Sequence, residues 1–224
     1  PARDGRVILA HLLTENGRIE NEFTITRMAS DHFYLLSAAI SELRDFDLLN
    51  HRKLATEDVT ITNITDDWGV LVLAGPRSRQ LLSKITDVDL GNDVFPWLTG
   101  QEIEVAGIPL RAIRVNYVGE LGWELHVPMD RLESLYDAVW SAGMAFGIAD
   151  FGVYAVNSLR MEKAYRAYGT ELTTEITMID ADMERFVKFK KKHFIGKQAT
   201  LQRKEEGSDF QLVYAELDAG DADA

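Results

Sequence analysis

The chain of 224 residues contains no cysteine. Disulfide bonds, thiolate metal ligands and cysteine nucleophiles are therefore excluded. A chain without cysteine fits a reducing compartment, such as the cytoplasm or the mitochondrial matrix. The sequence also lacks any apolar run of about 18 residues and any signal-peptide pattern, so we expect it neither to span nor to cross a membrane.

Positive charge is scarce. There are 24 basic residues against 36 acidic ones, which gives a formal net charge of −12. Such a surface repels phosphate backbones and argues against nucleic acid as a partner. The densest basic run, at 188–192, is interpreted as a solvated segment, with an anion contact as the alternative.

Nucleotide and metal motifs are also missing. We find no glycine-rich phosphate loop, no Gly-x-Ser-x-Gly elbow and no pair of histidines at metal-ligand spacing. No metal site is therefore predicted, and chemistry is left to carboxylates and tyrosines. The five histidines are scattered and are interpreted as structural or surface residues: His11, His32, His51, His126 and His193.

Hydrophobic patterning predicts the α+β class, with antiparallel sheets and helices on one face. Alternation over 18–26 predicts a half-buried strand with Ile19 and Phe23 inward and Glu22 on the polar face. A helix is expected to be capped by Asp130 and to end at Gly143. The other predicted elements are strands at 32–36, 59–64, 69–74, 102–105, 111–117 and 123–127, and helices at 40–55, 77–85 and 150–163. An apolar start at 7–10 and a strand-like end at 210–217 suggest a piece of a longer protein.

The sharpest local feature lies at 114–125, where two glycines, Gly119 and Gly122, form a turn between strands. A plain hairpin would account for it. As a motif, however, it resembles the Tyr-Thr-Gly-Glu-x-Gly-aromatic-Glu signature of the glycine-cleavage T-protein (aminomethyltransferase) superfamily. Four further segments resemble that family in the same order along the chain: 17–25, 69–76, 157–169 and 194–199.

Within the superfamily, the chain is most similar to the folate half of dimethylglycine and sarcosine dehydrogenases. The reason is the run Glu-Lys-Ala-Tyr-Arg at 162–166, where T-proteins usually continue Glu-Ala-Gly, and Val156, where they tend to carry arginine. The resemblance implies a three-lobed folate-binding fold whose C-terminal β-barrel is largely missing here. Its implied domains are a truncated α+β domain at 1–97, a folate-binding α+β domain at 98–205 and the start of the barrel at 206–224.

The resemblance also implies site residues. Glu124 would accept hydrogen bonds from the N3–H and 2-amino group of a pterin, and Tyr117 would contact the same ring. Strand parity alone puts these two on opposite faces, so only the loop between them can unite them. Glu22 stands where the family usually has Asp, and would be the catalytic carboxylate that carries a proton; an exposed strand glutamate is the alternative. Arg160 is a further cofactor-binding candidate, with a charge network on its helix as the alternative.

The implied function is transfer of a one-carbon unit from a small-molecule amine, as an N-methyl-derived iminium, to tetrahydrofolate, giving 5,10-methylenetetrahydrofolate. FAD would belong to a flavin domain of the same parent chain and would not be bound by this segment. Two alternatives stay open: a free-standing aminomethyl- or methyltransferase, and a non-catalytic folate-binding regulator. Met178 stands where the family often has Pro, and Asp-Ala-Asp-Met at 180–183 replaces its more usual Glu-Ala-Gly-Leu, so that Asp182 takes the place of glycine. These changes would alter the floor of the folate cavity.

Overall fold

Two antiparallel sheets carry the fold, whose computed structural model describes residues 3–210, 212–216 and 218. Helices gather on one face of the larger sheet, and the predicted α+β class is confirmed. By its contacts the chain forms two units. The first holds the described residues up to Ala10 together with Phe23–Lys163, and the second holds His11–Glu22 and the described residues from Ala164 onward. This grouping differs from the division at 97 and 205, and those domain boundaries stay a prediction.

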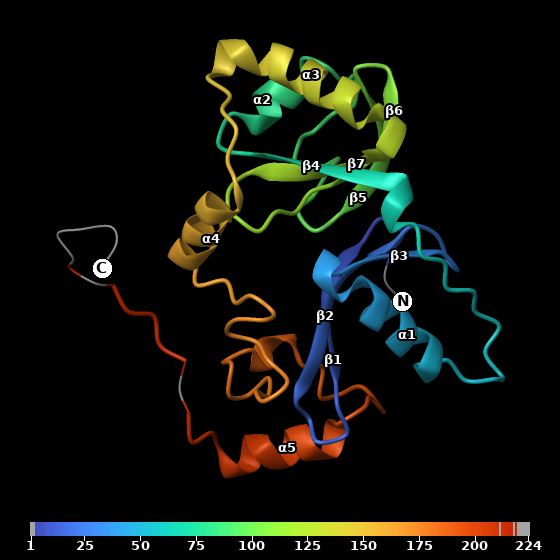
Figure 1. The fold of residues 1–224 in the computed structure, drawn as a ribbon, viewed down its shortest axis with the longest axis vertical. Helices are drawn as coiled ribbons and strands as arrows, with labels where there is room; N and C mark the ends of the chain where they lie inside the picture. The colour runs from blue at the N-terminus through green and yellow to red at the C-terminus, as the bar shows by residue number, and fades with distance from the viewer. Residues whose placement is uncertain (1–2, 211, 217, 219–224) are drawn as a thin grey trace. The chain divides into compact units, whose positions relative to one another are not determined.

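The larger sheet belongs to the first unit and has four strands. Helices α2 (Ser78–Leu82) and α3 (Leu132–Gly143) lie side by side over one face of it, as Figure 1 shows. Every neighbouring pair is antiparallel. In spatial order the strands are β4 (Trp68–Ala74), β7 (Gly122–Pro128), β6 (Ile108–Ile113) and β5 (Gly100–Val105).

The main core of the first unit fills the space between this sheet and its helices. Alternate side chains of β7, namely Trp123, Leu125 and Val127, are fully buried there, and Leu135 of α3 packs against the same cluster. Because successive side chains of a strand point to opposite faces, Glu124 lies on the other face of the sheet.

Several element ends differ from the sequence predictions. Strand β6 ends at Ile113, not at 117, because the chain turns at Arg114, whose guanidinium donates to the Phe95 carbonyl. Helix α3 is preceded by the 3₁₀ turn η3 (Met129–Arg131), and no side chain caps it, so the Asp130 cap is wrong. The helix ends at Gly143, as predicted, and a second 3₁₀ turn, η4 (Met144–Phe146), follows it up to Gly147, whose φ is 72°.

The smaller sheet has the order β1-β2-β3, with strands β1 (Val7–Leu13), β2 (Ile19–Arg27) and β3 (Phe33–Leu36). The predicted hairpin of β2 with β3 is confirmed, with Ile25 opposite Leu35. Strands β1 and β2 are joined by a turn in which Gly17 has φ +75°, a conformation that favours glycine. The chain passes from one unit to the other within both of these strands.

The second unit has a smaller core, built on residues of β1 and β2 and of the segments after 163. Helix α5 (Lys197–Glu206) and the 3₁₀ turn η5 (Glu184–Phe186) are its helical elements. The Tyr168 hydroxyl donates to the Glu20 carbonyl at 2.5 Å and ties a loop to β2. Its buried apolar residues are Leu13, Ile19, Leu172, Met178, Ala181 and Met183.

The remaining elements of the first unit are helical. The predicted helix at 40–55 is observed as η1 (Ala39–Ser41) and α1 (Glu42–Arg52), and that at 150–163 as α4 (Val153–Glu162). The segment 59–64 is not a strand but leads irregularly into η2 (Thr65–Asp67). Of the strand expected at 210–217, residues 210 and 212–216 are irregular, while 211 and 217 lie outside the described residues. Among the described helices, none has the length and apolarity needed to cross a membrane.

Candidate functional site

Glu124 lies in the middle of β7, on the sheet face that α2 and α3 do not cover. Val72, directly opposite it on β4, is 41% exposed, so this face is open beside the carboxylate. Its other neighbour, Ile113 of β6, is buried. The Glu124 side chain itself is 22% exposed. The strand therefore presents a carboxylate that is anchored at its base and reachable at its tip.

The Glu124 carboxylate is held by a histidine on its own strand. His126 Nε2 lies 3.3 Å from Glu124 Oε2, and His126 Nδ1 lies 3.2 Å from the Tyr34 hydroxyl. The imidazole is fully buried, and the tyrosine ring meets it edge-on with centroids 5.5 Å apart. Among the described residues, no group hydrogen-bonds to Oε1. One carboxylate oxygen is thus engaged and the other is available.

The Tyr34 ring packs against the Arg111 guanidinium, which also contacts the Trp68 ring. The Arg111 guanidinium lies 4.8 Å from the Tyr34 ring centroid and 4.1 Å from that of Trp68, both within cation–π range. Burial raises the pKa of Tyr34, while Arg111 acts in the opposite direction. The hydroxyl therefore remains protonated at neutral pH and is able to donate a hydrogen bond.

Tyr117 lies in the loop 114–121, not on a strand, so the parity argument does not apply to it. Asn116 organises this loop: its Oδ1 accepts from the amides of Val118 and Gly119, and its Nδ2 donates to the Glu120 carbonyl. Gly119 has φ +74°, and a Cβ there would lie 2.5 Å from Lys163 Cγ.

This loop is therefore fixed against the end of α4. Tyr117 itself is 38% exposed on the loop.

Arg160 is buried within α4. Its side chain donates from Nε and Nη2 to Asn157 Oδ1, one helical turn earlier, at 2.9 and 2.7 Å. Only 4% of the residue is exposed. These bonds fit the helix-network interpretation, and the cofactor-binding role stays a prediction.

Glu22 lies on β2 in the second unit, while Tyr117, Glu124 and Arg160 belong to the first. Its Oε2 is 2.8 Å from His11 Nε2 on β1. The glutamate side chain is 22% exposed and the histidine side chain 4%. The predicted polar face is confirmed at Glu22. Next to it, Asn21 is fully buried, and neither of its amide atoms has a partner among the described residues.

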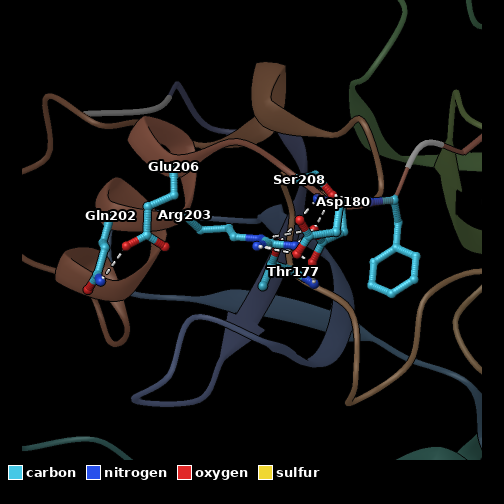
Figure 2. A network of polar contacts seen from close by, with 8 residues as sticks. Thr177, Asp180, Gln202, Arg203, Glu206 and Ser208 are labelled. Carbon is cyan, nitrogen blue, oxygen red and sulfur yellow. Dashed lines mark hydrogen bonds and ion pairs between the residues drawn. The ribbon is translucent and has the colours of Figure 1, made fainter.

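The residues at 178–183 that differ from the family's usual ones have structural roles in the second unit. Met178 is buried in its core. Figure 2 shows Asp180 at the centre of a polar network. It accepts from Thr177, from Ser208 and, at Oδ1, from Arg203 of α5 at 2.8 Å. Burial alone would raise the pKa of Asp180, but these hydrogen bonds together outweigh it and lower the pKa to about 2.

Two residues of the candidate site were missed by the sequence reasoning. His11 and His126 were assigned to structural or surface roles, yet each hydrogen-bonds a candidate carboxylate. For His126 a signal existed, because residues i and i+2 of a strand share a face and Glu124 is two positions earlier. His11 is eleven positions from Glu22, and only the pairing of β1 with β2 brings them together. Among the described residues, no group of acids and histidines is arranged to hold a metal ion.

Comparisons with known proteins relate the chain to dehydrogenases and to aminomethyltransferases. Human mitochondrial dimethylglycine dehydrogenase is 42% identical over 96% of this chain, which covers 25% of that protein. An aminomethyltransferase of Thermoanaerobacter sp. (strain X514) is 32% identical over 96% of this chain and 58% of its own. The crystal structure of aminomethyltransferase T of the glycine cleavage system from Bartonella henselae aligns with TM-score 0.78 and 26% identity, over 92% of this chain and 54% of that one.

The chain thus spans about a quarter to somewhat more than half the length of these relatives. The family described as the GCVT N-terminal domain matches residues 1–191. This is an aminomethyltransferase-type domain, homologous to part of dimethylglycine dehydrogenase, and the chain belongs to the GCVT N-terminal domain family.

Proposed function

We propose that this chain is the tetrahydrofolate-binding, one-carbon transfer module of a flavin-dependent dimethylglycine or sarcosine dehydrogenase. The product would be 5,10-methylenetetrahydrofolate, formed from an iminium derived from an N-methyl group. The observation that carries the proposal is the Glu124 carboxylate, with one oxygen engaged by His126 and the other available beside the exposed Val72 of β4. The likeness to dimethylglycine dehydrogenase supports the choice of parent enzyme.

The residues present fit a pterin. A carboxylate has about four acceptor positions, and His126 uses one of those on Glu124, so two adjacent N–H donors can still be accepted. The accessible ring of Tyr117 suits contact with a flat heterocycle. When bound, tetrahydrofolate supplies the amine nitrogen that takes up the one-carbon unit. Glu124 would bind and orient the pterin edge, and Tyr117 would cover its face.

Glu22 would handle the proton that such a transfer releases. Its Oε2 accepts from His11, while Oε1 has no hydrogen-bond partner among the described residues. A carboxylate in this state can accept a proton at Oε1, and the histidine keeps the group oriented. The family's usual Asp is one methylene shorter, so Glu22 reaches farther from β2.

A free-standing aminomethyltransferase is the second candidate, because an aminomethyltransferase is also among the relatives, at 32% identity over 96% of this chain. Single-turnover assays of the full-length protein separate the two. Product formation from dimethylglycine or sarcosine, dependent on flavin, supports the dehydrogenase module. Formation only from an aminomethyl donor supports the transferase, and tight folate binding without any transfer supports a regulator.

The proposed binding of folate by Glu124 is tested with Glu124→Gln in the full-length protein. Glutamine keeps the shape but replaces one acceptor oxygen with a donor, so folinic acid should bind about thirtyfold more weakly, roughly 2 kcal/mol. Isothermal titration measures the affinity. Glu104→Gln is the matched control, an exposed glutamate on β5 of the same sheet that should retain wild-type affinity. Unchanged affinity in Glu124→Gln would remove Glu124 from the site.

A further inference from the structure

Three side chains of the first unit stand in a hydrogen-bonded row that neither the motif nor the family likeness assigns. Tyr34 of β3, His126 of β7 and Glu124 of β7 are joined through the two ring nitrogens of the histidine. Tyr34 is 7% and His126 1% exposed, so water does not compete for these bonds. Only the last member of the row is open to solvent.

The direction of the row follows from what each group can donate. Tyr34 keeps its proton at neutral pH, because burial raises its pKa. The neighbouring Arg111 has N–H groups only and cannot accept a hydrogen bond from Tyr34. A Tyr34 hydroxyl that donates to His126 Nδ1 leaves that nitrogen as the one without a hydrogen.

The opposite nitrogen then carries the hydrogen. His126 Nε2–H donates to Glu124 Oε2, which orients the carboxylate plane and directs Oε1 away from the histidine. If the ring carried its hydrogen on Nδ1, a bare Nε2 lone pair would face Oε2 and repel it. The tyrosine hydroxyl thus selects the one tautomer that can hold the carboxylate.

We propose that Tyr34 and His126 are positioning residues for Glu124: the tyrosine fixes the histidine tautomer, and the histidine in turn aims the carboxylate at its ligand. The proposal rests on the proposed function for the identity of that ligand, a pterin edge with two adjacent N–H donors. The stack of Arg111 between Trp68 and Tyr34 supports the row by holding the tyrosine ring in place. Neither Tyr34 nor His126 touches the ligand in this arrangement.

The tautomer can be read without any ligand. In full-length protein labelled with ¹⁵N-histidine, His126 should show Nε2 protonated and Nδ1 unprotonated at neutral pH, with the signal assigned by its loss in His126→Gln. Tyr34→Phe should weaken that preference or reverse it, because the donor to Nδ1 is gone. A wild-type ring protonated on Nδ1 alone, or on both nitrogens, would overturn the proposal whatever the variants do.

A double-mutant cycle tests whether Tyr34 acts through Glu124. Tyr34→Phe should weaken folinic acid binding about fivefold in the wild-type background and less than about twofold in the Glu124→Gln background. A purely structural role would weaken binding equally in both backgrounds and would overturn the proposal. Tyr136→Phe, which removes an exposed hydroxyl bound to Asp150, is the matched control and should leave affinity unchanged.

The two proposals fail in different ways. If Glu124→Gln weakens binding but Tyr34→Phe binds like wild type, the positioning row is wrong and the folate site stands. If wild type does not bind folinic acid, or Glu124→Gln leaves affinity unchanged, the folate site is wrong, while the ¹⁵N spectrum still decides the tautomer.

Discussion

Among the described residues, two carboxylates pair with an imidazole: Glu124 with His126 in the first unit and Glu22 with His11 in the second. Their carboxylates are equally exposed, at 22%. They differ at the far nitrogen of the histidine. His126 Nδ1 is hydrogen-bonded to a buried tyrosine, whereas His11 Nδ1 has no hydrogen-bond partner among the described residues.

This difference suits the two pairs to different work. An imidazole with both nitrogens engaged is fixed in one tautomer and can only orient its carboxylate. An imidazole with one nitrogen unengaged can gain or lose a proton while it keeps its bond to the carboxylate. From this difference we propose that Glu124 binds the ligand and that Glu22 transfers the proton.

Replacing Glu22 tests most directly whether the two pairs have different roles. Glu22→Gln should leave folinic acid affinity within about twofold of wild type, but should slow one-carbon transfer roughly 10²–10⁴-fold because glutamine cannot take up a proton. The measurement is single-turnover formation of 5,10-methylenetetrahydrofolate by the full-length protein. Glu22→Asp, which restores the family's usual residue, should retain or raise the rate. Transfer by Glu22→Gln at the wild-type rate would show that the two pairs do not divide the work in this way.

The surroundings of the two pairs also differ. Glu124 lies on a sheet backed by the large apolar core of the first unit, while Glu22 lies in a unit whose small core is supplemented by the polar network of Asp180. The pKa of Asp180 is lowered to about 2 from 3.8. A carboxyl group with a lowered folded-state pKa stabilises the fold above its unfolded pKa, and this stabilisation is lost as the pH falls through the folded value.

Asp180→Asn should therefore destabilise the second unit by on the order of 2 kcal/mol at most at neutral pH. The deficit relative to wild type should shrink as the pH falls from about 4 to 2, where the wild-type carboxyl group becomes protonated. All four tryptophans, at 68, 97, 123 and 140, lie in the first unit.

Tryptophan fluorescence therefore reports unfolding of the first unit, while far-ultraviolet circular dichroism reports both units. Denaturation followed by both signals shows which unit loses stability. A deficit that does not depend on pH would contradict the ionic role of Asp180. Asp4→Asn, an exposed acid paired with Arg27, is the control and should show little change.

The sequence predicted the parts of this architecture that depend on local patterning. Strand β7 and the Glu22 face of β2 follow from alternating polarity, and α4 follows from its helical run. The segment 59–64 has the β-branched composition of a strand but pairs with no strand in the described part of the chain, and pairing depends on residues far away in the sequence. The Asp130 cap failed because a 3₁₀ turn replaces the first turn of α3.

The candidate site likewise combines residues that a local pattern predicts with residues that only the folded structure brings in. Glu22 and Glu124 were identified from motifs, since each lies in a local pattern. Their histidine partners depend on the pairing of strands and on side-chain geometry, which single-sequence reasoning does not provide. Tyr34, ninety-two positions before His126, carried no local signal at all.

The smallest expected effect concerns Asp182, which stands where the family usually has glycine. Its φ is +52°, a left-handed conformation that costs a residue with a Cβ about 1–2 kcal/mol. Its carboxylate is 85% exposed and lies 3.4 Å from Arg166 Nη2, an exposed pairing of little value. Asp182→Gly and Asp182→Ala both remove this ion pair, but only glycine relieves the backbone. The glycine variant should therefore be more stable than the alanine variant by about 1 kcal/mol in urea denaturation followed by circular dichroism. Equal stability would mean that the second unit relaxes around residue 182 and that its left-handed backbone stores no strain.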